Sequence, residues 1–174
     1  MEKVAEGELV KDRVIISEQN AIAELYDERY FGKVIEGRLY LSLIEALLLV
    51  ERGWISVMEK GKEIGFDELL ERAKEFDEDV VTEYIVYRDL RNRGYIVKTG
   101  YKFGADFRVY DKGAKLGENH SKFLVKVLRE ECKVKLNELS ASIRVAHTVK
   151  KRLVIGVVDS EGDVTYYKFT RVKP

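Results

Sequence analysis

The hydrophobic pattern of this chain changes its period at Gly94. Before this glycine, apolar residues recur every three or four positions and predict a helix over residues 79–93. After it, apolar and polar residues alternate, which predicts β-strands. The strands are expected at residues 95–98, 103–110, 121–128, 152–159 and 164–172, with one helix at residues 137–150. The second half of the chain is therefore predicted to be a mixed β-sheet with flanking helices.

The first part of the chain predicts a smaller unit of helices and strands. Ser42 and Glu45 have the S-x-x-E spacing of a capping box, and Gly53 stands where the left-handed residue after that helix is expected. Further elements are expected at residues 6–16 (a strand or hairpin), 17–25 (a helix capped by Ser17), 38–41 (a strand), 54–64 (a hairpin around Lys60-Gly61) and 67–76 (a helix). The N-terminal part is thus predicted to be α/β, and the whole chain α+β.

The acidic run at residues 77–79 predicts a boundary between two domains, residues 1–78 and residues 79–174. Residues 1–80 hold 20 acids and 11 bases, a net charge of −9, whereas residues 81–174 hold 11 acids and 20 bases, a net of +9. This asymmetry suggests that the basic part faces a polyanion. The alternative is two solvated surfaces whose charges balance for solubility.

Composition excludes several classes of protein. Apolar residues make up 45% of the 174 residues, which is enough for a core, and no apolar run approaches the roughly 20 residues of a membrane span. Cys132 is the only cysteine, so an intramolecular disulfide framework is excluded. Since no secretory leader is visible, a cytoplasmic protein is expected. Charged residues reach 36%, against about 25% in ordinary domains, and this bias fits a heat-adapted protein.

The motifs predict no cofactor and no metal site. His120 and His147 have no partner at the spacing of a zinc site, and no phosphate-binding glycine loop is present. A basic domain with a mixed sheet could still be a metal-dependent DNA nuclease, which needs clustered carboxylates. Asp106 could be one such acid, but Leu124 stands where its paired acid is wanted. This class is therefore kept as an alternative.

The predicted strand directions bring three titratable residues to one edge of the sheet. Tyr110 ends the strand at residues 103–110, and His120 precedes the next strand, which should run antiparallel to it. Residues 121–159 predict a strand, a helix and a second strand parallel to the first, and Lys151 precedes this second strand. A phenol, an imidazole and an ammonium are thus expected to meet.

This trio suits cleavage of RNA without a metal ion. The ribose 2′-OH would attack the adjacent phosphorus, so a base must take one proton, an acid must donate another, and a cation should stabilise the developing charge. Tyrosine serves as a base only if nearby cations lower its pKa, and Lys150, Lys151 and Arg152 are the candidates. Each residue also has an ordinary structural interpretation, such as a surface histidine or a basic helix end, and His147 is interpreted as structural.

The amino-acid sequences of several segments, spread over most of the chain, resemble those of one known family. The segments read YLSLIEA at residues 40–46, RNRGY at 91–95, KFGADFRVY at 102–110, HSKFLV at 120–125, IRVAH at 143–147 and KK at 150–151. Together they are similar to the archaeal tRNA-splicing endonucleases, also called tRNA-intron endonucleases.

The resemblance implies cleavage of precursor tRNA at a bulge–helix–bulge, leaving a 2′,3′-cyclic phosphate and a 5′-OH. In this family pattern Tyr110 matches the general base, His120 matches the general acid, and Lys151 matches the transition-state cation. Lys150 is the alternative cation, because the double lysine leaves the match ambiguous by one residue. A catalytically silent structural subunit and an RNA-binding module without activity are further alternatives.

The resemblance also implies how substrate and subunits are held. Arg144 matches an arginine that stacks on a bulged base, and Tyr166 is the candidate for the other side of that base. The acidic turn with Asp159, Glu161 and Asp163 is implied to enter a basic pocket of a neighbouring subunit. The chain length matches the homotetrameric members of the family. Without the resemblance, the same turn is simply a polar hairpin turn.

Overall fold

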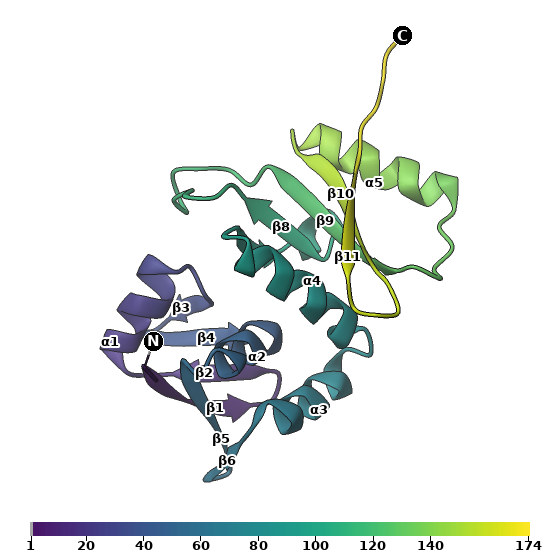
Figure 1. Ribbon diagram of the computed structural model, residues 1–174. Helices are drawn as coiled ribbons and strands as arrows, with labels where there is room; N and C mark the ends of the chain where they lie inside the picture. Colours follow the sequence, from purple (N-terminus) through teal and green to yellow (C-terminus); the bar gives the residue numbers. More distant parts are fainter. Residues whose placement is uncertain (1) are drawn as a thin grey trace. The chain divides into compact units, whose positions relative to one another are not determined.

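The computed structural model describes residues 2–174, which form two units that meet in the sequence between Val81 and Thr82 (Figure 1). Each unit combines a β-sheet with helices. The predicted α+β class is therefore confirmed. Within the described residues, no helix has the length and apolar character that crossing a membrane requires.

The N-terminal unit is built on a sheet with strand order β3-β4-β2-β1-β5-β6. Its elements are β1 (Ala5–Val10), β2 (Arg13–Ile16), α1 (Gln19–Ile22), the π-helical turn η1 (Ala23–Glu28), β3 (Lys33–Ile35), β4 (Arg38–Ser42), α2 (Leu43–Glu51), β5 (Ile55–Glu59), β6 (Lys62–Ile64) and α3 (Phe66–Phe76). Strands β1 and β5 pair in parallel, and the other neighbours pair antiparallel. The predicted hairpins at residues 6–16 and 54–64 are confirmed.

Helix α2 begins and ends as its sequence predicts. The hydroxyl of Ser42 accepts a hydrogen bond from the backbone N–H of Glu45, whose carboxylate accepts one from the backbone N–H of Ser42. Gly53 has a φ of 70°, and the N–H groups of Gly53 and Trp54 close the helix end. Because α2 packs against β2, β4 and β5, its buried leucines form the core of this unit.

Two features of the N-terminal unit differ from the prediction. The helix expected after Ser17 has Glu18 at its N-cap, without a side-chain hydrogen bond, so Ser17 does not cap it. Strand β3 was not predicted, because its three residues are too short to show an alternating pattern. It pairs with β4 through a tight turn at Glu36 and Gly37, which both have positive φ.

The C-terminal unit has a sheet with strand order β11-β10-β9-β8-β7. The elements are α4 (Val80–Asn92), β7 (Ile96–Thr99), the 3-10 turn η2 (Tyr101–Phe103), β8 (Phe107–Tyr110), β9 (Phe123–Arg129), α5 (Leu136–Thr148), β10 (Arg152–Val158) and β11 (Val164–Phe169). As predicted, β9 is antiparallel to β8 and parallel to β10, with α5 between them in the chain.

The strand expected at residues 103–110 begins only at Phe107, and this prediction was too long. Gly100 comes so close to the next segment that a Cβ there would lie 2.7 Å from the backbone of Phe107. The intervening chain turns through η2 and leaves it at Gly104, which has a φ of 68°. Gly100 allows the close backbone approach, and Gly104 allows the left-handed conformation. The chain therefore forms a turn where the first half of the strand was predicted.

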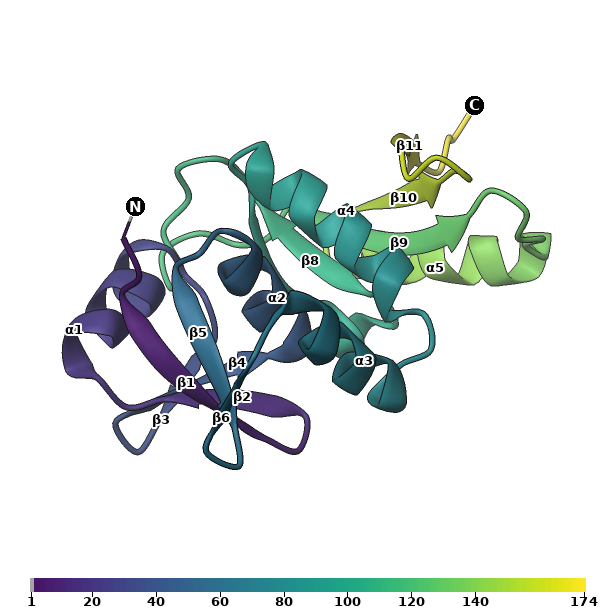
Figure 2. The ribbon, with the colours of Figure 1, turned by 60° about the horizontal axis from the view of Figure 1, so that its bottom comes forward.

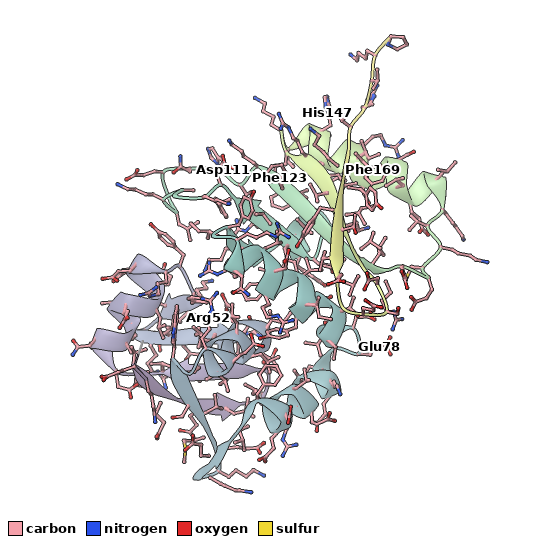
Figure 3. All side chains as sticks on the ribbon, viewed as in Figure 1. Arg52, Glu78, Asp111, Phe123, His147 and Phe169 are labelled. Atoms are coloured by element: carbon pink, nitrogen blue, oxygen red, sulfur yellow. The ribbon has the colours of Figure 1, made fainter. Side chains whose placement is uncertain are left out.

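The helices α4 and α5 cover opposite faces of this sheet (Figure 2). On the α4 face, the rings of Tyr87 and Phe107 lie 5.8 Å apart. On the α5 face, a core cluster is formed by Ala105, Leu124, Ala146 and Leu153, with Phe169 and other apolar residues packed against it (Figure 3). Because side chains alternate along a strand, the face of each residue can be assigned from this register.

Candidate active site

The predicted convergence occurs at one edge of the C-terminal sheet. In the strand register, Val109 lies opposite Phe123, and Phe123 lies opposite Arg152. The end of β8 and the starts of β9 and β10 therefore share this edge. Tyr110, the residues before β9 and Lys151 are all placed there, as the strand directions predict.

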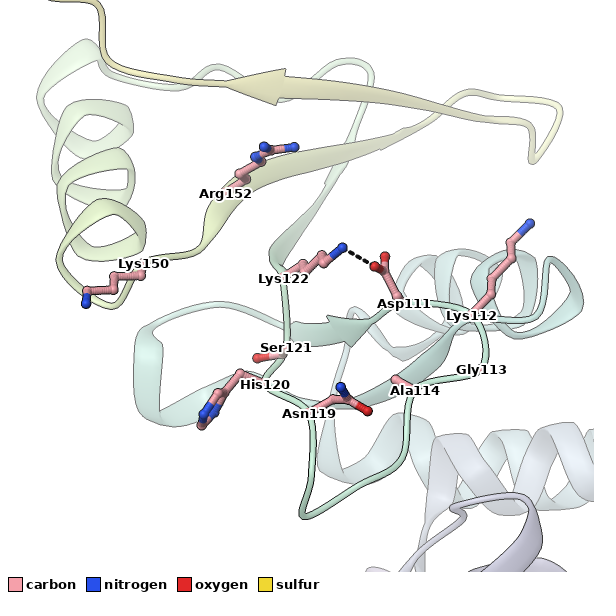
Figure 4. Close-up of a pocket in the computed structure, with 10 residues that line it drawn as sticks. All are labelled: Asp111, Lys112, Gly113, Ala114, Asn119, His120, Ser121, Lys122, Lys150 and Arg152. Atoms are coloured by element: carbon pink, nitrogen blue, oxygen red, sulfur yellow. Dashed lines mark ion pairs between the residues drawn. The ribbon is translucent and has the colours of Figure 1, made fainter.

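Backbone hydrogen bonds fix the chain just before β9. The N–H of Lys122 donates to the carbonyl of Val109 at 2.9 Å, and the N–H of Arg152 donates to the carbonyl of Lys122 at 2.9 Å. Ser121 is buried, and its carbonyl accepts a hydrogen bond from Nζ of Lys151 at 2.8 Å. His120 is exposed and directly precedes this fixed segment (Figure 4). The backbone of His120 is therefore joined directly to a segment that hydrogen bonds hold in place.

A polar pocket of about 660 Å³ opens beside this edge (Figure 4). Its lining comes from the loop between β8 and β9, from the turn between α5 and β10, and from the first residue of β10. The charged and imidazole groups of the lining are those of Asp111, Lys112, His120, Lys122, Lys150 and Arg152. Asp111 forms an ion pair with Lys122, and the other cations leave the pocket net positive. The pocket thus suits an anionic ligand.

The turn between α5 and β10 positions Lys151. Lys150 follows the helix with a left-handed φ of 57°, and its N–H donates to the carbonyl of His147. The N–H of Lys151 donates to the carbonyl of Ala146 at 2.8 Å, which completes a Schellman motif. Only Lys150 of the two lysines lines the pocket, whereas Lys151 is the one bound to Ser121. Burial, assisted by the charges of Arg108 and Lys102, lowers the pKa of Lys151.

Arg108 lies near Tyr110 and Lys151 and was not considered in the sequence interpretation. It lies two residues before Tyr110 on β8, and its guanidinium carbon lies 5.9 Å from the centroid of the Tyr110 ring. Arg108 pairs with Leu124 in the register, so Arg108 and Tyr110 both lie on the α5 face. Tyr110 itself is only 7% exposed. The spacing of two along a predicted strand was the available signal.

Arg144 and Tyr166 are not brought together within this chain. Arg144 is exposed on α5, and His147 is exposed on the same helix (Figure 3). Tyr166 lies on the α4 face, where its hydroxyl donates to the carboxylate of Asp89 at 2.6 Å. Burial first, and then this hydrogen bond, raise the pKa of Tyr166. Arg144 and Tyr166 could therefore contact the two sides of one base only if they came from two different chains.

The acidic turn lies at the far end of β10 from the three converging residues. The carboxylate of Asp159 accepts hydrogen bonds from the N–H groups of Glu161 at 2.9 Å and Asp163 at 3.0 Å. Asp159 therefore builds the turn, whereas the side chains of Glu161 and Asp163 are exposed. Within one chain, the length of β10 separates these two carboxylates from Lys151.

The residues weighed for a metal site have other contacts. Oδ2 of Asp106 accepts a hydrogen bond from the backbone N–H of Val127 at 2.7 Å, and Leu124 is buried in the core. Over residues 2–174, no group of three or more histidine, cysteine, aspartate or glutamate side chains has the arrangement of a metal site. The polar lining of the pocket is instead dominated by cations.

The chain matches known proteins over nearly its whole length. Residues 5–70 match the model of the tRNA intron endonuclease N-terminal domain, and residues 80–166 match that of the catalytic C-terminal domain. The chain is 46% identical to a tRNA-splicing endonuclease of Thermococcus onnurineus and 47% identical to one of Pyrococcus abyssi, in each case over 99% of both chains. It is 41% identical to one of Methanococcus maripaludis, over 98% of this chain and 96% of the relative. The chain therefore belongs to the tRNA intron endonuclease family.

Proposed function

We propose that this protein removes introns from precursor tRNA by metal-independent cleavage at bulge–helix–bulge sites. The ribose 2′-OH attacks the adjacent phosphorus, the bond from phosphorus to the 5′-oxygen breaks, and the products carry a 2′,3′-cyclic phosphate and a 5′-OH. The observation that carries the proposal is the meeting of Tyr110, His120 and Lys151 at one sheet edge, beside a net positive pocket. Full-length similarity to archaeal tRNA-splicing endonucleases supports the substrate class.

Lys151 is assigned the role of the cation that stabilises the charge on phosphorus. Its ammonium is held by the Ser121 carbonyl at 2.8 Å, so it is preorganised at the edge where the phosphate would lie. Preorganised charge is usually the largest single contribution to catalysis, because no reorganisation is needed during the reaction. Lys150 lines the pocket but has no comparable anchor for its side chain in the described residues.

Tyr110 and His120 are assigned the two proton transfers. Tyr110 takes the proton of the 2′-OH, and the guanidinium carbon of Arg108 lies 5.9 Å from the centroid of its ring. His120 gives a proton to the departing 5′-oxygen. Its exposed position beside the pocket leaves the imidazole accessible to RNA. The sequence interpretation expected Lys150, Lys151 or Arg152 beside the tyrosine, and Arg108 takes that place in the proposal.

The remaining roles concern assembly and substrate binding. The N-terminal domain serves assembly, and the C-terminal domain carries the chemistry. Glu161 and Asp163 contact a basic surface of a neighbouring subunit in a homotetramer, and Arg144 stacks on a bulged base. Support for these roles comes from the exposure of all three side chains and from their charge.

The proposal is tested with purified protein and a bulge–helix–bulge RNA in the presence of EDTA. We expect cleavage, with a 2′,3′-cyclic phosphate on one product and a 5′-OH on the other. Cleavage that requires added Mg²⁺ and leaves other ends would support the metal-dependent alternative. Tight binding without any cleavage, under conditions in which a relative cuts the same RNA, would support a silent subunit or a binding module.

A further inference from the structure

Three cations lie together on the α5 face of the C-terminal sheet. The ammonium nitrogens of Lys102 and Lys151 lie 4.9 Å and 5.7 Å from the centroid of the same Phe103 ring. Arg108 lies on β8, and its guanidinium carbon lies over the ring of Tyr110. Among the ion pairs formed within residues 2–174, none joins one of these three cations to a carboxylate. Positive charge is thus concentrated here without an internal counter-ion.

This arrangement is unfavourable in the absence of an anion. Like charges close together disfavour the charged form of each group, and the lowered pKa of Lys151 reflects burial together with the charges of Arg108 and Lys102. Nε of Arg108 is buried and meets no hydrogen-bond acceptor in the part of the chain that is described. An unsatisfied buried donor carries a desolvation penalty that an entering acceptor can offset. The cluster is therefore stabilised when an anion binds.

We propose that Lys102 and Arg108 form, together with Lys151, a binding site for a phosphate group of the RNA backbone. The inference rests on the proposed function and assigns two residues to substrate binding. A guanidinium fork matches the geometry of a phosphate group, which is the anion that RNA supplies, and ammonium groups add charge to such a site. The Phe103 ring holds the two lysines through cation–π contacts and keeps their charges close to Arg108.

The first test measures RNA binding at several salt concentrations. The RNA carries a 2′-deoxyribose at the cleavage site, so that binding is measured without turnover. Each phosphate contact contributes about 0.7 to 0.9 to the slope of log K against log salt concentration. Lys102→Met and Arg108→Met should each reduce this slope by about that amount and weaken binding roughly five- to fifty-fold at low salt. Arg108→Lys should keep the slope.

The matched control is Lys133→Met, which removes one positive charge from an exposed loop of the same domain. It should leave the slope and the affinity nearly unchanged. Lys102 is exposed, so Lys102→Met tests the site even if Arg108→Met fails to fold. Folded Lys102→Met and Arg108→Lys variants are each informative. An unchanged slope in Lys102→Met, or a loss in Lys133→Met as large as in Lys102→Met, would overturn the site.

The second test uses inorganic phosphate without RNA. The Nε–Hε resonance of Arg108 should shift on titration with phosphate, but not with chloride at equal ionic strength, and Lys102→Met should weaken this response. A response to phosphate with no RNA cleavage would uphold the site while contradicting the proposed function. Normal cleavage together with no phosphate response, and an unchanged salt slope in Lys102→Met, would overturn the site alone.

Discussion

The ammonium of Lys151 donates a hydrogen bond to the backbone carbonyl of Ser121 across 2.8 Å. This bond joins the start of β10 to the segment that directly follows His120. Lys151 is thereby held beside the residue that directly follows His120, which lies 31 positions earlier in the sequence. The geometry explains why Lys151, rather than the adjacent lysine, is expected to act on the scissile phosphate.

Substitutions of Lys151 and of Lys150 should have clearly different effects on the cleavage rate and on stability. Lys151→Met should slow cleavage by about 10²–10³, as for the loss of a preorganised group that stabilises transition-state charge. Lys150→Gly should raise the free energy of unfolding by about 1 kcal/mol, because glycine adopts the left-handed conformation of this position without strain. It should weaken substrate binding only moderately. Single-turnover rates and thermal unfolding of both variants check this, and a larger rate loss in Lys150→Gly than in Lys151→Met would reverse the assignment.

His120→Ala should slow cleavage by roughly 10²–10⁴, the usual contribution of a positioned acid, while RNA affinity at the same salt stays nearly constant. The matched control is His147→Ala, since His147 is also an exposed histidine of this domain but lies on α5. That variant should cut at the wild-type rate. Equal rates for both variants would remove His120 from the reaction.

Tyr166→Phe should show that the hydroxyl of Tyr166 contributes to the stability of the fold. Removal of its bond to the Asp89 carboxylate should lower the free energy of unfolding by about 1–2 kcal/mol near neutral pH. Because the folded state raises the pKa of Tyr166 above its unfolded value of about 10, its contribution is fully present below pH 10 and is lost as the pH rises above it. Denaturant unfolding from pH 7 to 11 should therefore show that the free energy of unfolding of the wild type approaches that of the variant above pH 10. A constant difference would contradict this.

Glu161→Lys combined with Asp163→Lys should dissociate the oligomer and reduce cleavage with it. Complementary charge across an interface becomes like charge, at a cost of several kcal/mol. Asp159 is left intact, because its carboxylate holds the turn through the two following N–H groups. Light scattering and circular dichroism measure mass and folding together. A folded double variant with the mass and activity of the wild type would make these residues part of an ordinary turn.

Features set by short-range chemistry and strand direction could be predicted from the sequence. The capping box of Ser42 and Glu45 follows from local hydrogen bonding, and the meeting of Tyr110, His120 and Lys151 follows from the directions of three strands. Contacts that depend on three-dimensional packing could not be predicted. Tyr166 meets Asp89 from 77 residues away, and a close backbone approach at Gly100 replaces the first half of a strand. Arg108 was overlooked because an arginine on an alternating strand has the pattern of an ordinary surface residue.

The most direct test of the account replaces one ribose. A bulge–helix–bulge RNA with 2′-deoxyribose at the cleavage site lacks the internal nucleophile but keeps every phosphate. In EDTA, the protein should bind this RNA with the affinity of the unmodified RNA and leave it uncut, while it cleaves the unmodified RNA to a 2′,3′-cyclic phosphate. Cleavage of the deoxy-substituted RNA at the same position would contradict the transesterification mechanism and the roles given to Tyr110, His120 and Lys151.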